Sequence, residues 1–184
     1  MDKKGMRRLC ADLLRGLEGR DTGTPSGLFT ALCAGMTRRH DRLVSHRLVR
    51  FPTGTASGLW VATATRHFVL CEQDTAPEHQ LVILGHEFWH LETHKGVAGG
   101  EAEAVAAAQL LAQDVSPTTV EHIARRSTVH SHDQAEEAAC EYFGSLLASR
   151  AWPLLASAGT GGSVPSSGVA HRIESSLDPR GLVR

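Results

Sequence analysis

The sequence has few of the features that mark several large classes of protein. Its 184 residues include four cysteines and one tyrosine, and the formal net charge is −1. This balance and the scarcity of aromatic side chains argue against direct nucleic-acid binding. The cysteines are far apart and form no Cys-x-x-Cys pair, which argues against a disulfide framework or a four-thiolate zinc site. We expect buried free thiols at Cys10, Cys33, Cys71 and Cys140.

Long hydrophobic runs are also missing. Charged residues interrupt residues 1–20, so this segment lacks the apolar core of a secretory signal, and no later run is long enough to cross a bilayer. Together with unpaired cysteines, this predicts a protein of the reducing cytoplasm without a membrane partner. The apolar and charged fractions, 41% and 21%, are ordinary for a globular chain.

Hydrophobic periodicity predicts one domain over residues 1–152 and a Gly/Ser-rich C-terminal tail over residues 153–184. Apolar residues at helical spacing predict N-terminal helices within residues 1–50, the second of them capped by Ser26. The β-branched and aromatic residues of 58–72 predict a β-hairpin. Propensity and periodicity predict further helices over residues 81–95, 101–113, 117–126 and 133–150.

Five arginines lie between residues 38 and 50. One interpretation is a patch that contacts phosphates. The other is a solvated helix face followed by a strand, and it accounts for the same residues without a nucleic-acid partner. We therefore favour the second interpretation.

The stretch "LGHEFWHLETH" at residues 84–94 contains a His-Glu-x-x-His motif. On a helix, residues four apart lie on one face about 6 Å apart along the axis, so His86 and His90 can both reach one metal ion. Glu87 lies on the adjoining face and can take a proton from a metal-bound water. His94 is about 12 Å along the axis from His86, which is too far to share that ion.

A catalytic zinc site built on this motif needs a third protein ligand. The downstream histidines His122, His130 and His132 are possible, but no local pattern supports them. On a later helix Glu137 and Glu141 stand one turn apart, opposite an apolar face. We favour Glu137 as the ligand, with Glu136 as a fallback. Glu141 can then accept the second N–H of a zinc-bound histidine.

These residues resemble the ImmA/IrrE family of metallopeptidase-like proteins. The family pattern is an H-E-x-x-H helix followed by E-x-x-A-E/N-x-F-A on a later helix. Here the second part reads "EAACEYFG" over residues 137–144, with Cys140 and Gly144 standing where alanine is usual. The similarity covers roughly residues 25–150. It implies an α+β fold: a mostly helical, zincin-like domain with a small antiparallel β-sheet beside the His-Glu-x-x-His helix.

The resemblance also implies a chemistry. It makes His86, His90 and Glu137 the ligands of one Zn²⁺ per chain and Glu87 the catalytic carboxylate. Its implied substrate is a helix-turn-helix transcriptional repressor, cleaved in stress responses or in the regulation of mobile elements. No residue is clearly placed to stabilise an oxyanion. The possible donors are Tyr142, His130, His132 and His171.

Two functions therefore remain. The first is a cytoplasmic zinc endopeptidase that hydrolyses a peptide bond in a protein partner. The second is a non-catalytic zinc-containing sensor, or a toxin–antitoxin-like component, that acts by binding a protein. A zinc ion closed off by a fourth protein ligand would favour the second function.

Overall fold

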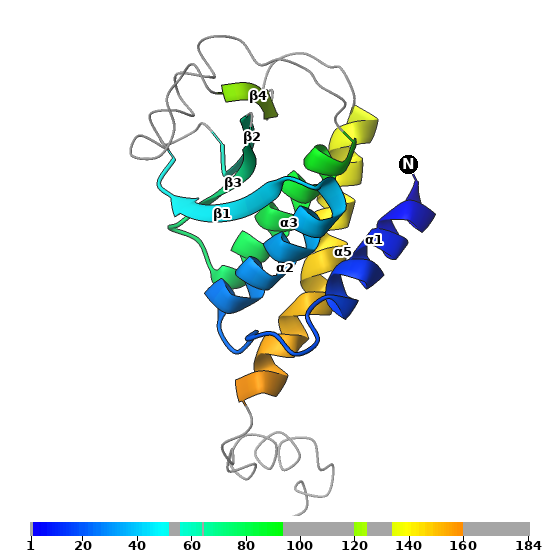
Figure 1. Cartoon of the computed structure of the whole chain (residues 1–184), viewed down its shortest axis with the longest axis vertical. Coiled ribbons are helices and arrows are strands. Elements are labelled where there is room, and N and C mark those ends of the chain that lie inside the picture. The colour runs from blue at the N-terminus through cyan, green and yellow to red at the C-terminus, as the bar shows by residue number, and fades with distance from the viewer. Residues whose placement is uncertain (1, 52–55, 64, 94–119, 125–133, 160–184) are drawn as a thin grey trace, which may run out of the picture.

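The computed structural model describes residues 2–51, 56–63, 65–93, 120–124 and 134–159. Its helices are α1 (Lys3–Arg15), α2 (Pro25–His40), α3 (Pro77–Thr93) and α5 (Gln134–Gly159). Its strands are β1 (Leu43–Val49), β2 (Gly58–Thr63), β3 (Arg66–Glu72) and β4 (Val120–Ala124). Figure 1 shows the sheet lying across one side of the helices, which confirms the α+β class.

Helix α3 is the central element of the fold. It contacts α5 along one side, α2 along another, and strands β2 and β3 of the sheet, while α1 packs against α2 and α5 (Figure 1). Leu81, Leu84 and Phe88 of α3 are completely buried. The prediction of a helix around the His-Glu-x-x-His motif is confirmed, and its apolar sides explain why it is buried.

The two N-terminal helices begin at side-chain caps. Asp2 accepts a hydrogen bond from the Gly5 N–H at 2.9 Å at the start of α1. The cap of α2 is Thr24, whose hydroxyl oxygen accepts from the Gly27 N–H at 3.0 Å. The prediction of Ser26 as this cap is therefore wrong, because the preceding proline already occupies the first helical turn, where its missing N–H costs nothing.

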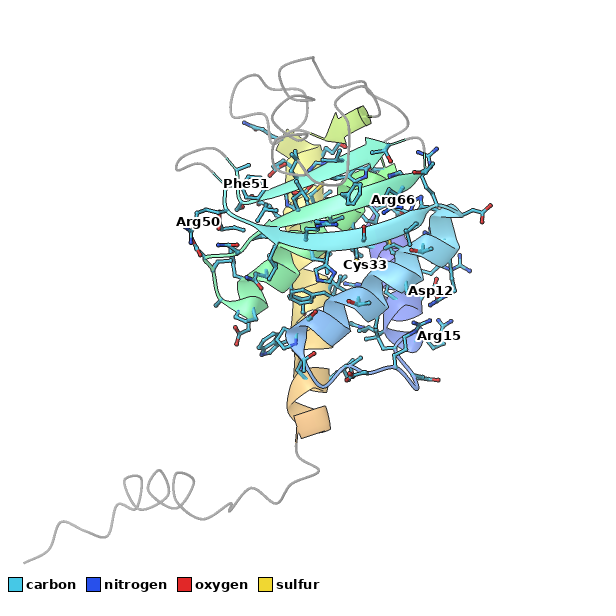
Figure 2. All side chains as sticks on the ribbon, turned by 60° about the vertical axis from the view of Figure 1, so that its left-hand side comes forward. Asp12, Arg15, Cys33, Arg50, Phe51 and Arg66 are labelled. Carbon is cyan, nitrogen blue, oxygen red and sulfur yellow. The ribbon has the colours of Figure 1, made fainter. Side chains whose placement is uncertain are left out.

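The described strands form one sheet in the order β1-β3-β2-β4. Strands β2 and β3 form the predicted antiparallel hairpin, but β1 pairs with β3 in parallel. The prediction of an antiparallel sheet is wrong for this pair: the chain reverses between β1 and β2, and β3 then inserts between them. In Figure 2, Arg50 and Phe51 follow β1 at one end of the sheet and Arg66 opens β3 at the other.

One local prediction is wrong where long-range contacts decide the structure. The segment expected as a helix over residues 117–126 contains strand β4, whose backbone pairs antiparallel with β2. The N-terminal helices end at His40 and not at residue 50, and the strand expected after the helix in the basic stretch is β1. Pairing with a sheet edge outweighs intrinsic helix propensity, which differs by less than about 1 kcal/mol between ordinary residues.

Helix α5 continues through Pro153 to Gly159, beyond the predicted start of the tail at residue 153. A proline inside a helix costs about 3 kcal/mol. Ala151 is completely buried nearby, and Trp152 and Leu155 pack partly buried against the core. Full burial of one large apolar side chain contributes about 1.5–3 kcal/mol, so the partly buried Trp152 and Leu155 together can offset that cost. The rest of the predicted tail and the predicted helix over 101–113 lie outside the described residues.

The arginines between residues 38 and 50 make contacts within the protein. Arg39 donates hydrogen bonds to Glu92 of α3, Arg50 binds Asp74 at 2.8 Å, and Arg42 donates to the Thr63 carbonyl oxygen at 3.0 Å. These contacts favour the structural interpretation of the basic stretch. None of the helices described is both long and apolar enough to cross a membrane.

Candidate metal centre

Helix α3 presents His86 and His90 on one buried face. Their Nε2 atoms are 3.1 Å apart, and their ring centroids are 4.8 Å apart. The two residues are 5% and 7% exposed. The four-residue spacing therefore brings together two nitrogen atoms that can act as metal ligands, as the sequence predicts.

Helix α5 brings Glu137 to the same point. One carboxylate oxygen lies 3.6 Å from His86 Nε2 and the other lies 3.8 Å from His90 Nε2. Tetrahedral zinc with bonds of about 2.0–2.1 Å separates neighbouring ligand atoms by about 3.3 Å. The three separations measured here are close to that value, so the donor set fits a zinc ion.

Two glycines allow α5 to approach α3 this closely. A Cβ atom on Gly144 would lie 2.5 Å from the Val82 carbonyl oxygen, and one on Gly85 would lie 2.9 Å from Gly144 Cα. Such separations are far shorter than van der Waals contact, so only glycine fits without a shift of the helices. This crossing places the turns of α5 that carry Glu137 beside the histidines of α3.

Cys140 adds a second donor group to this region. Its Sγ lies 3.6 Å from His90 Nδ1, and the ligand atoms of His86, His90 and Cys140 all lie within 4.8 Å of one another. These three buried residues can therefore hold a metal ion. Burial raises the pKa of the Cys140 thiol, and nearby carboxylates raise it further. As predicted, Cys140 and the other three cysteines are buried and free.

The two nitrogens of His90 distinguish the possible ligand sets. The Glu137 carboxylate faces Nε2, whereas the Cys140 sulfur faces Nδ1 on the other side of the ring. A metal ion held by both Nε2 atoms and Glu137 leaves Cys140 as a hydrogen-bond partner of His90. Such a partner fixes the tautomer and orientation of a metal-binding histidine. The sequence predicts Glu141 as the hydrogen-bond partner of a metal-binding histidine, whereas the structure places Cys140 beside His90 Nδ1.

The side chain of Glu87 extends from α3 to Gly58 of the sheet, and the residue is 3% exposed. A Cβ atom on Gly58 of β2 would lie 2.6 Å from Glu87 Oε1. The missing side chain at Gly58 therefore leaves the space that this carboxylate occupies. Burial raises the pKa of the neighbouring Cys71 thiol well above its ordinary value, and the charge of Glu87 adds to that shift.

A pocket of about 290 Å³ opens beside His86 and Glu87. It lies between α3, α5 and the residue before β2, and its lining includes Ser57, His79, Val82, Ile83, Glu141 and Ser145. The pocket connects one proposed metal ligand and the proposed base to space outside the protein. A substrate carbonyl needs this kind of access to a catalytic zinc site.

The other predicted site residues have different positions. Glu141 is exposed and lines the pocket, and Glu136 is half-buried one residue before Glu137. The ring of Tyr142 packs under Lys3 of α1, with the ammonium nitrogen 5.5 Å from its centroid. Only the backbone of His122 is described, and four histidines lie outside the described residues: His94, His130, His132 and His171.

Sequence reasoning did not assign four residues that the structure places at or beside the site. Cys140 is three positions after Glu137 and therefore shares its helix face, a spacing that was visible in the sequence. His79 is seven positions before His86 and shares its face in the same way. Ser57 and Ser145 carry no comparable signal, because only the packing of β2 and α5 against α3 brings them to the pocket.

Comparison with known proteins gives no independent assignment of this site. No family model, no curated protein and no solved structure matches the chain. The interpretation of the centre therefore rests on its own geometry and on the sequence motifs.

Proposed function

We propose that the protein is a zinc-dependent endopeptidase, with His86, His90 and Glu137 as ligands and Glu87 as general base. The observation that carries the proposal is the position of one Glu137 carboxylate against the Nε2 atoms of both histidines, at 3.6 and 3.8 Å. Two histidines and one glutamate are a ligand set of catalytic zinc sites, which leave the fourth position to water or substrate.

A zinc ion bound there would lower the pKa of its water and polarise a peptide carbonyl. The protein's own contribution is the placement of proton-transferring and binding groups. Glu87 lines the pocket directly beside His86, where its carboxylate can take the proton from the attacking water. The same group can then deliver that proton to the leaving amine. Ser57, His79 and Ser145 supply hydrogen-bond donors along the pocket.

The ImmA/IrrE resemblance supports a protein substrate for this chemistry. Under this proposal the substrate is a helix-turn-helix transcriptional regulator, and its cleavage in the cytoplasm relieves repression. A peptide library of mixed sequence can test the chemistry before the regulator is known. The experiment requires only that the hydrolysis of peptide bonds is detected.

The decisive experiment separates metal binding from catalysis. The purified protein should bind one zinc ion per chain and cleave members of a peptide library, with products identified by mass spectrometry. Glu87→Gln should keep the zinc and lose cleavage by about 10²–10⁴-fold. Glu78→Gln, an exposed change at the start of the same helix, is the matched control. Cleavage at the wild-type rate by Glu87→Gln would contradict the mechanism.

A non-catalytic zinc sensor, or a toxin–antitoxin-like component, is the second candidate. It is favoured by one observation, the position of the Cys140 sulfur within reach of the same histidines. If the imidazole ring of His90 rotated, Cys140 and Glu137 could both coordinate the same metal ion. No coordination position would then remain for water. Substitution with Co²⁺ distinguishes the two functions, because a thiolate ligand gives a near-ultraviolet charge-transfer band. The sensor predicts this band and its loss in Cys140→Ala, whereas the peptidase predicts no band.

A further inference from the structure

We propose that the pocket beside His86 binds a cationic group of the peptide substrate through the carboxylate of Glu141. The group is a lysine or arginine side chain next to the scissile bond, or the N-terminal ammonium of the peptide. This inference rests on the proposed peptidase function and names the class of substrate that the site selects.

The position of the pocket follows from helix spacing. His79, Val82 or Ile83, and His86 follow one another at three- to four-residue intervals, so they line about two turns of α3. Glu141 and Ser145 stand one turn apart on α5 and form the facing wall. The pocket therefore extends from the proposed metal centre along the groove between α3 and α5. A substrate group next to the reacting carbonyl can enter this groove.

The charge of the pocket favours a cation. The described residues that line it include Glu87 and Glu141 but no lysine or arginine. The two positive charges of a zinc ion are matched by the carboxylates of Glu87 and Glu137. The Glu141 carboxylate is exposed, and no hydrogen bond or ion pair to it occurs within the described part of the chain. It is thus an additional negative charge that a substrate cation can neutralise.

The shape of the pocket favours a single long side chain or a chain end. Its volume of about 290 Å³ lies just below the range of about 300–1,000 Å³ typical of small-molecule sites. Val82 and Ile83 supply apolar wall, while Glu141 and Ser145 supply polar atoms. Lysine and arginine match this combination, because their methylene stems pack on apolar surface while their charged ends remain on polar groups.

Matched peptides that differ at one residue beside the scissile bond test the inference. One set carries lysine, methionine or glutamate at that position, and each peptide is made with a free and with an acetylated N-terminus. Wild-type protein should prefer the lysine peptide, or the free N-terminus, by roughly tenfold in kcat/KM. Glu141→Gln should remove most of that preference and leave cleavage of the acetylated methionine peptide unchanged. Glu78→Gln, which removes an exposed carboxylate outside the pocket lining, is the matched control.

A binding measurement keeps this test separate from that of the peptidase function. The same peptides are titrated into zinc-loaded Glu87→Gln protein, in which binding is measured without turnover. Tighter binding of the cationic peptides, lost in the Glu87→Gln, Glu141→Gln double variant, supports the inference even if the wild type cleaves nothing. Equal binding of lysine, methionine and glutamate peptides overturns it, even if the wild type cleaves all of them. A preference that follows the free N-terminus alone assigns the cation to the ammonium group.

Discussion

Gly85 and Gly144 bring helices α3 and α5 into direct backbone contact. A Cβ atom built on Gly85 would lie 2.9 Å from Gly144 Cα. The proposed metal centre depends on this contact, because its histidines lie on α3 and its glutamate on α5. The separation of two glycine backbones thus sets the distance between the proposed metal ligands.

Gly144→Ala tests the importance of this contact. An alanine in a helix is normally about 1 kcal/mol more stable than glycine. Here its Cβ would meet the Val82 carbonyl oxygen at 2.5 Å, so we expect destabilisation of about 1–3 kcal/mol instead. Urea denaturation of the metal-free protein measures the change. Ser149→Ala, at an exposed position of α5, is the control. Stabilisation by Gly144→Ala would show that the helices are not held this close.

Glu137→Gln tests the third ligand. Zinc at about 100 times its dissociation constant should stabilise the wild type by about 2.7 kcal/mol, since the ion binds only the folded site. Glu137→Gln should lose most of this zinc-dependent gain, and a chelator should remove it from the wild type. Thermal unfolding with and without zinc measures the effect, with the exposed change Glu78→Gln as control. If the gain survives in Glu137→Gln but is lost in Cys140→Ala, the ligand set contains cysteine instead.

Gly58→Ala tests the placement of the proposed base. The added Cβ would lie 2.6 Å from Glu87 Oε1 and 2.5 Å from Ile83 Cγ2. The flexible carboxylate should move away, so peptide cleavage should fall at least tenfold while zinc stoichiometry stays near one. Gly35→Ala introduces a comparable clash with a Leu13 methyl group on the other side of the protein and should leave cleavage unchanged. Loss of activity in both variants would indicate a general folding defect.

His46 should make stability depend on pH. Figure 2 shows Cys33 of α2 beneath the sheet, and its sulfur lies 3.9 Å from His46 Nδ1. The Phe29 ring packs edge-on against His46 at 5.5 Å. Burial in these surroundings lowers the pKa of His46 from its ordinary value of 6.5. The unfolded chain therefore binds a proton more readily, and stability should fall as the pH drops below about 6.5.

Comparison with His46→Gln isolates this effect. The difference in free energy of unfolding between the wild type and the variant should be larger at pH 7.5 than at pH 5.5. Urea denaturation of metal-free protein at constant ionic strength measures both values. A difference that is constant, or that grows toward low pH, would contradict a lowered pKa for His46.

Sequence by itself determined the features that depend on neighbours within a few turns of the chain. The four-residue spacing of His86 and His90 already fixes both imidazoles on one helix face, and apolar periodicity locates α1, α2 and α3. The β-branched and aromatic residues of 58–72 likewise predict the hairpin from local sequence alone. The helix and the motif of Glu137 predict it as a ligand, and its carboxylate lies 3.6 Å from His86 Nε2 and 3.8 Å from His90 Nε2.

Only the tertiary structure decided what depends on segments far apart in the chain. The parallel pairing of β1 and the conversion of residues 120–124 to strand β4 come from sheet pairing, which no local propensity encodes. Packing against the core carries α5 through Pro153. The crossing of α3 and α5 places Cys140 at His90 Nδ1 and forms the pocket that Glu141 lines. Local sequence specifies the residue types of the proposed ligands and the helices that carry them, whereas packing between helices specifies which atoms meet.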